Sequence, residues 1–82
     1  PRAQPDPSRV FFGATVTLKN EEDQVRTTYQ LVGPDETDPR GGRISIHSPI
    51  GRALVGRRQG ETVRVKRPKG EVELTVVDIR YV

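Results

Sequence analysis

The chain has 82 residues, a net charge of +3 and no cysteine, which excludes disulfides, thiolate nucleophiles and cysteine-based zinc sites. A chain of this length forms at most one domain and buries about 60% of the surface of its unfolded form, so we expect a thin core without a deep substrate pocket. No apolar run approaches the roughly 20 residues of a membrane helix, and the N-terminus lacks the apolar region of a signal peptide. We therefore expect a cytoplasmic protein with no membrane partner.

Charge is unevenly distributed along the chain. Residues 21–40 carry six acidic residues and two arginines, whereas residues 41–60 carry four arginines and no acidic residue. This asymmetry predicts a dipolar domain whose field can steer a charged partner, and it says nothing about the fold.

The N-terminal half predicts a tail, two strands and a long loop. Residues 1–9 contain three prolines and no hydrophobic pattern, so we expect a linker or disordered tail before a domain at residues 10–82. Alternating apolar residues predict strands at residues 14–19 and 25–31. The loop at residues 33–42 contains two prolines and three glycines and is expected to hold no regular element.

Three further strands are expected in the second half of the chain. Alternation predicts them at residues 43–47, 62–66 and 71–82, and the sequence RPKG at residues 67–70 is typical of a tight turn. The apolar residues of the last strand change phase near Val76, which predicts a bulge or strong twist there.

Between the third and fourth strands, HSPIGRALVG predicts a short helix. Ser48 is expected to cap it, Pro49 to be its first residue and Gly56 to end it in a left-handed conformation, while Gly51 weakens it by about 1 kcal/mol relative to alanine. Such a helix is stable only when its apolar stripe packs on the sheet. The expected fold class is therefore α+β, with a curved antiparallel sheet of about five strands and one short helix across it. The stripe consists of Ile50, Ala53 and Leu54.

No pattern in the sequence predicts catalysis, a metal site or a cofactor. His47 is the only histidine, and its neighbour Ser48 points to the opposite face of a strand, so the two are badly placed to act as base and nucleophile. The acidic stretches at residues 20–23 and 35–38 lack the spacing of a calcium loop. We expect no catalytic residue and no bound cofactor or metal.

A set of basic residues leaves weak contact with RNA or DNA open as an alternative. Such residues can bind phosphate, but no aromatic side chains are interleaved with them as a stacking platform requires. The set consists of Arg57, Arg58, Arg64, Lys66, Arg67 and Lys69.

Three segments together carry a resemblance to a known family. They are RVFFGATVTL, YQLVGPDETD and RISIHSPIGRALVGRRQGETVRVKRPKGEVELTVVDIRY, which span residues 9–82. In this order and at this spacing they resemble the C-terminal domain of the bacterial GreA/GreB transcript-cleavage factors, most closely the GreB branch.

The resemblance implies an FKBP-like fold and a protein partner. In that family this domain docks on the coiled coil at the rim of the secondary channel of RNA polymerase. A separate N-terminal helical hairpin enters the channel, where its acidic tip helps hold the metal ion with which polymerase cleaves backtracked RNA. That hairpin is absent from residues 1–82, so we expect a non-enzymatic docking domain that does not stimulate cleavage by itself.

The resemblance also implies which residues contact the partner. In the family an Asp or Asn followed by Ser-Pro precedes the short helix and contributes to docking, and here these positions are His47, Ser48 and Pro49. With Arg52 they form the predicted contact. Gly51 stands where alanine is common, which leaves open the related, polymerase-linked regulators of nucleoside diphosphate kinase. The FKBP-like fold also raises prolyl isomerase activity, although the chain has only four aromatic residues to line such a pocket.

Overall fold

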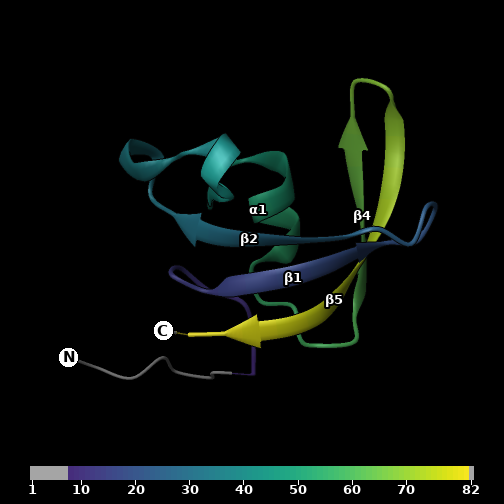
Figure 1. The fold of residues 1–82 in the computed structure, drawn as a ribbon, viewed down its shortest axis with the longest axis horizontal. Helices are drawn as coiled ribbons and strands as arrows, with labels where there is room; N and C mark the ends of the chain where they lie inside the picture. The colour runs from purple at the N-terminus through teal and green to yellow at the C-terminus, as the bar shows by residue number, and fades with distance from the viewer. Residues whose placement is uncertain (1–7, 82) are drawn as a thin grey trace.

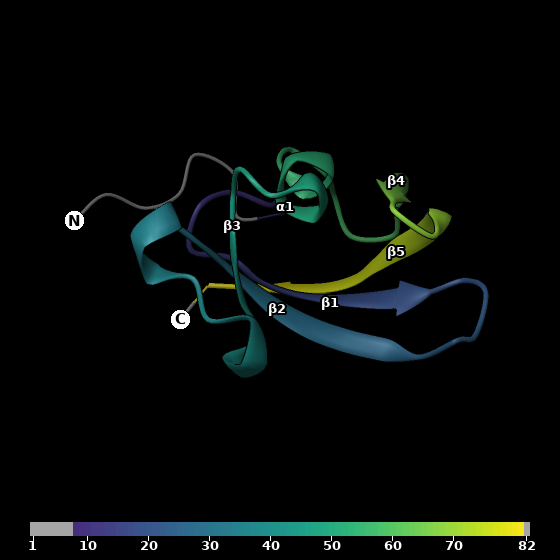
Figure 2. The same ribbon diagram turned by 90° about the horizontal axis from the view of Figure 1, so that it is seen from above.

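The computed structural model describes residues 8–81, which form one five-stranded sheet curled around a short helix (Figures 1 and 2). The expected α+β class is confirmed, and no helix within the described residues is long and apolar enough to cross a membrane. The expected tail at residues 1–9 lies outside the described residues except for Ser8 and Arg9. In chain order the elements are β1 (Thr15–Asn20), β2 (Arg26–Val32), the 3₁₀ turns η1 (Pro34–Glu36) and η2 (Pro39–Gly41), β3 (Arg43–Ser45), α1 (Pro49–Leu54), β4 (Thr62–Arg67) and β5 (Gly70–Arg80).

The sheet is mixed rather than wholly antiparallel. Its order is β3-β2-β1-β5-β4, and every neighbouring pair is antiparallel except β2 and β3. The expectation of an antiparallel sheet was wrong for this pair, in which Leu31 lies opposite Ile44 in a parallel register. The loop at residues 33–42 explains the difference, because it is long enough to carry the chain back along β2 before β3 begins.

This loop also contains more regular structure than the sequence predicts. Pro34 begins η1 and Pro39 begins η2, since the fixed φ of proline suits the first residue of a helical turn. The side chain of Asp38 caps η2 by accepting the Gly41 N–H at 3.2 Å. The expectation of no regular element was therefore wrong for these two single turns.

The core lies on the concave face of the sheet, which α1 covers (Figure 2). Along β1, buried residues alternate with half-buried ones, as a strand with one face on the core requires. Leu54 of α1 is fully buried, and burial of a leucine side chain stabilises a fold by about 2 kcal/mol. The other core residues are Val10, Ala14, Val16, Leu18, Leu31, Val63, Val65, Val72, Leu74 and Val76.

A bulge in β5 explains the change of phase in its apolar pattern. Thr17 of β1 lies opposite Asp78, whereas the next residue, Leu18, lies opposite Val76. Val77 is therefore the extra residue on β5, and the bulge expected near Val76 is confirmed. Because of it, the last apolar residues of β5 pack against the same core as the first ones.

Hydrogen bonds hold the segment before β1 against the end of α1 and the end of β5. Val10 is fully buried, and its N–H donates to the Arg57 carbonyl at 2.9 Å. The Tyr81 hydroxyl donates to the Arg9 carbonyl at 2.5 Å and accepts the Phe11 N–H at 2.9 Å. These contacts fix the position of α1 relative to both ends of the described chain.

Gly51 lies where the first turn of α1 comes closest to the end of β3. A Cβ atom at Gly51 would be 2.3 Å from the carbonyl oxygen of Ser45 and 3.0 Å from the Cα of Ile46. Both are backbone atoms, so relieving the clash requires α1 to move away from β3. The expectation that Gly51 weakens the helix left out this contact, which gives Gly51 a steric role that alanine cannot fill.

We expect Gly51→Ala to lower the free energy of unfolding by about 1–3 kcal/mol, because the cost of overpacking exceeds the gain in helix propensity. Urea denaturation followed by circular dichroism measures this. Arg52→Ala, on the exposed side of the same turn, is the control and should change stability by less than about 0.5 kcal/mol. A Gly51→Ala variant as stable as the parent would show that β3 and α1 are not packed this closely.

A hydrogen-bond chain links the β1–β2 turn to β5. The Thr75 hydroxyl donates to the Glu21 carboxylate, and the hydroxyl oxygens of Thr62 and Thr75 lie 2.8 Å apart. The bond from Thr75 lowers the pKa of Glu21 below its ordinary value; partial burial opposes this shift, and the charge of Lys19 adds to it. The folded-state pKa of Glu21 is therefore the lower one, so Glu21 stabilises the fold above its unfolded-state pKa. This stability is lost as pH falls through the folded-state pKa.

Thr75→Val is expected to raise the pKa of Glu21 toward its ordinary value, because the variant keeps the shape of the side chain and removes the donor. An NMR titration of the Glu21 carboxyl carbon measures the pKa directly. Thr15→Val, the control, changes another half-buried threonine of the sheet and should leave the pKa of Glu21 unchanged. An unchanged Glu21 pKa in Thr75→Val would mean that the hydrogen bond does not form in solution.

Candidate docking surface

The chain turns sharply between β3 and α1. The Ser45 hydroxyl accepts the His47 N–H at 2.9 Å, and the Ser45 carbonyl accepts both the N–H (3.0 Å) and the hydroxyl (2.7 Å) of Ser48. The third strand was expected to reach His47 but ends at Ser45. The Ile46 N–H still donates to the Val32 carbonyl of β2 at 3.0 Å, whereas the N–H groups of His47 and Ser48 bond to Ser45 within the turn. The turn is rigid because its donors and acceptors satisfy one another.

α1 begins and ends as the sequence predicts. The Ser48 hydroxyl accepts the Gly51 N–H at 3.0 Å, and Pro49 is the first helical residue. Gly56, with φ of 85°, lies two residues past the last helical residue and supplies the expected left-handed stop.

The structure presents most of the predicted contact residues to solvent. The side chains of His47, Pro49 and Arg52 are exposed, whereas Ser48 is half-buried. Ser48 caps the helix, so its hydroxyl serves the turn itself. A rigid turn that exposes its neighbours can bind a partner without a large loss of conformational entropy.

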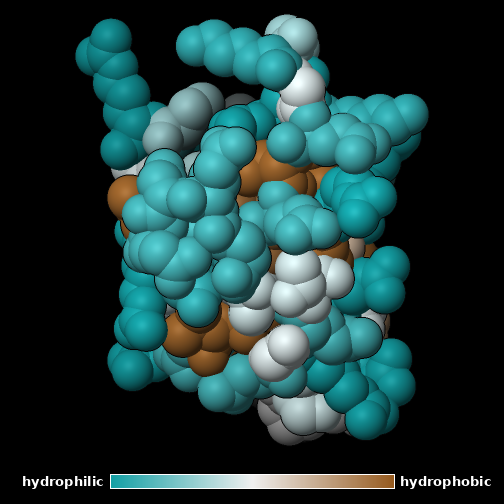
Figure 3. All heavy atoms as spheres, turned by 90° about the vertical axis from the view of Figure 1, so that its right-hand side faces the viewer, coloured by the Kyte–Doolittle hydropathy of each residue, from teal (hydrophilic) through white to brown (hydrophobic). Residues whose placement is uncertain are grey.

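Beside this turn lies an apolar groove of about 220 Å³ between α1 and the β4–β5 hairpin. Pro49 and Ile50 lie on the α1 side, and Val65 and Pro68 lie on the hairpin side. Figure 3 shows the side of the molecule that carries the hairpin, where apolar surface lies in narrow strips between hydrophilic side chains. The groove is lined by Ile44, Ser48, Pro49, Ile50, Val65, Lys66, Arg67 and Pro68.

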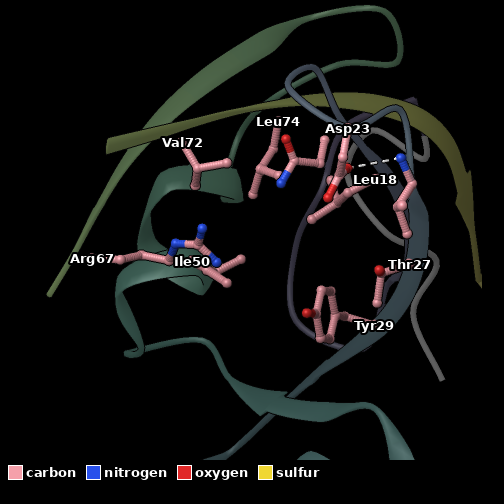
Figure 4. A pocket seen from close by; sticks show the side chains of 10 residues that line it. Leu18, Asp23, Thr27, Tyr29, Ile50, Arg67, Val72 and Leu74 are labelled. Atoms are coloured by element: carbon pink, nitrogen blue, oxygen red, sulfur yellow. Dashed lines mark hydrogen bonds between the residues drawn. The ribbon is translucent and has the colours of Figure 1, made fainter. Parts of the chain in front are cut away.

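A second hollow of about 130 Å³ adjoins the groove and shares Ile50 and Arg67 with it. In Figure 4 the guanidinium group of Arg67 extends over this hollow toward Ile50, and Tyr29 lies on the opposite side. The two hollows therefore form one surface that passes beneath Arg67. The second hollow is lined by Leu18, Asn20, Asp23, Val25, Thr27, Tyr29, Ile50, Arg67, Val72 and Leu74.

The sequence predicts the α1 side of this surface but not the hairpin side. The tight turn at residues 67–70 is predicted and confirmed, with Gly70 at φ of 124°. No pattern indicates that Val65, Arg67 and Pro68 face α1 across a groove. Their position depends on the curl of the whole sheet, which brings the hairpin beside the helix (Figure 2).

The turn offers no arrangement for nucleophilic catalysis. The Ser48 hydroxyl donates to the Ser45 carbonyl, so its proton points to a backbone oxygen and not to a base. The His47 side chain is exposed to solvent. Within residues 8–81, no group of three or more histidine or acidic side chains is placed to hold a metal ion.

The structure separates the basic residues that were considered for nucleic-acid binding. Arg57 and Arg58 precede β4, whereas Arg67 is its last residue and Lys69 lies in the turn that follows, at the tip of the β4–β5 hairpin (Figure 1). Between them, Arg64 forms ion pairs with carboxylates of β5, at 3.2 and 3.8 Å. The basic set therefore does not form one continuous track for a phosphate backbone.

The fold is a five-stranded mixed sheet with one short helix, and a rigid, exposed turn lies beside an apolar groove. The sequence model of the family described as "Transcription elongation factor, GreA/GreB, C-term" matches residues 4–81. The chain belongs to this family, and the match covers the family's C-terminal domain.

Individual relatives agree with this assignment. The transcription elongation factor GreA of Pseudomonas aeruginosa is 46% identical over 80 residues, which are 98% of this chain and 51% of the relative. Among solved structures, the GreA/GreB factor from Nitrosomonas europaea has a TM-score of 0.78 at 31% identity, covering 93% of this chain and 63% of that one. Gfh1 from Thermus aquaticus has a TM-score of 0.81 at 32% identity, covering 94% and 51%.

The chain thus spans about half the length of the curated relative it matches. The family predicted from the sequence is confirmed. The more specific assignment to the GreB branch stays a prediction, since the relative described above is a GreA factor.

The hydrogen bonds of Ser48 predict its contribution to stability. We expect Ser48→Ala to lower the free energy of unfolding by about 1 kcal/mol, because the Gly51 N–H loses its acceptor. Ser48→Thr keeps a hydroxyl and should recover most of this loss. Thermal and urea unfolding measure both variants, and equal stability of Ser48→Ala and the parent would contradict the capping role.

Proposed function

We propose that residues 10–82 form the domain through which a GreA/GreB-type elongation factor docks on RNA polymerase in the cytoplasm. The proposed contact on the polymerase is the coiled coil at the rim of its secondary channel. In such a factor, cleavage of backtracked RNA is promoted by an N-terminal coiled-coil hairpin that lies outside residues 1–82. The domain itself binds and does not catalyse.

The exposed turn beside the apolar groove carries this proposal. His47, Pro49 and Arg52 provide solvent-exposed contacts on a turn fixed by its own hydrogen bonds. The adjoining groove offers apolar surface, and each Å² of it that a partner covers contributes about 25 cal/mol before the costs of association. Rigid polar contacts around an apolar centre are the usual composition of a protein interface.

Two alternatives find less support. A nucleic-acid interface requires a continuous basic surface, but four of the six basic residues lie at or beyond the ends of β4, and ion pairs offset the charge of Arg64 between them. A prolyl isomerase pocket requires an aromatic lining, but Tyr29 is the only aromatic residue that lines the second hollow, and Phe12 lies elsewhere and is 54% exposed.

Binding to bacterial core RNA polymerase tests the proposal directly. We expect the His47→Ala, Arg52→Ala double variant to bind at least about tenfold more weakly, a loss of about 1.4 kcal/mol, in biolayer interferometry. These two side chains are better targets than Ser48, whose replacement also disturbs the helix cap.

Arg26→Ala, Arg40→Ala is the matched control, because it also removes exposed side chains but leaves the turn and the groove intact. Its affinity should stay within about twofold of the parent. Equal affinity of all three proteins would show that the contact with polymerase does not involve the turn. If the parent chain does not bind polymerase at all, the proposed function is wrong.

A further inference from the structure

Arg67 lies where three hollows of the surface meet. It lines the apolar groove, the second hollow, and a third hollow of about 340 Å³ at the hairpin tip that it shares with Pro68 and Lys69. Its guanidinium group extends over the second hollow toward Ile50, a residue that also lines the groove (Figure 4). A molecule seated in the groove therefore comes close to Arg67.

The positive charge of the hairpin tip is free to meet a partner. Lower in the hairpin, Arg64 forms ion pairs with Glu71 and Glu73, which offset its charge. By contrast, Arg67 and Lys69 are exposed, and neither forms an ion pair with a residue in the described part of the chain. We call Arg67 and Lys69 the tip cations.

The tip cations are also held in place. Arg67 pairs with Gly70 across the end of the β4–β5 ladder. Pro68 fixes one φ angle between them, and Gly70 adopts φ of 124°, which closes the turn. A turn of this kind fixes where the two side chains leave the backbone, so less backbone entropy is lost when they contact a partner.

We propose that the tip cations recognise acidic side chains of the docked polymerase segment, next to the apolar side chain that this segment places in the groove. This inference rests on the proposed docking function and adds the chemistry of the partner. A partner surface with an apolar residue beside carboxylates matches an apolar groove that Arg67 lines, with Lys69 in the adjoining hollow at the tip. The tip cations act as specificity-determining residues, because a neutral or basic segment of similar shape gains nothing from them.

The surroundings of the hairpin favour protein carboxylates over a phosphate backbone. A hollow of about 200 Å³ beside the hairpin is lined by Glu21, Glu22, Glu71, Val72 and Glu73. A nucleic-acid strand that continued past the tip in this direction would meet repelling carboxylates. Within residues 8–81, no aromatic side chain lines the tip hollow to stack a base. A short acidic segment of a protein avoids both problems.

Charge reversal at the tip tests the inference. Binding of the 82-residue chain to bacterial core RNA polymerase is measured between about 50 and 300 mM salt for three proteins. They are the parent, the tip double variant Arg67→Glu, Lys69→Glu, and the control double variant Arg26→Glu, Arg40→Glu. Both variants change the net charge equally, at exposed positions. We expect the tip variant to bind at least about tenfold more weakly at low salt, with a shallower salt dependence, and the control to stay within about twofold.

The double variant His47→Ala, Arg52→Ala, introduced above, separates the possible failures. If it loses affinity while the tip variant binds like the parent, the role of the tip cations is overturned and the docking function stands. If the parent does not bind polymerase, both the docking function and the role of the tip cations are overturned. If charge reversal instead abolishes a salt-sensitive affinity for bare single-stranded RNA and leaves polymerase binding intact, the tip recognises phosphate and the inference is wrong. A circular-dichroism melt of each variant verifies that it is folded.

Discussion

The candidate site depends on the contact between the end of β3 and the first turn of α1. One oxygen atom, the carbonyl of Ser45, accepts two hydrogen bonds from Ser48 and approaches Gly51 so closely that a Cβ atom does not fit. This contact fixes the direction in which the helix leaves the strand. The same direction exposes Pro49 and places Ile50 at the groove, so the shape of the docking surface follows from backbone packing.

The opposite side of the groove depends on the curl of the sheet. β4 lies at the edge of the sheet beyond β5, and the bulge at Val77 increases the local twist of β5. The curl brings the β4–β5 hairpin beside α1 (Figure 2), to which residues 55–61 connect it. A groove built from separate rigid elements keeps its width only when both are anchored. The burial of Val65 and Leu54 in one core provides this anchorage.

What the sequence predicts and what it misses have a common physical cause. The capped start of α1, its left-handed stop, the tight turn at residues 67–70 and the bulge follow from φ restrictions and side-chain periodicity within a few residues. They are confirmed. The parallel pairing of β3 and the steric role of Gly51 were missed, as was the hairpin side of the groove. Each of these depends on which segments meet after folding, and local patterns do not encode that information.

The distribution of charge at the surface matters more for recognition than the net charge of +3. At physiological ionic strength, charges farther apart than about 8 Å are largely screened, so a contact depends on the charges that border it. In the β4–β5 hairpin, ion pairs offset the charge of Arg64, and positive charge remains at the tip, next to apolar surface. Apolar burial supplies most of the affinity of such an interface. The neighbouring charges orient the partner and exclude those of the wrong sign, so a surface this small can still be selective.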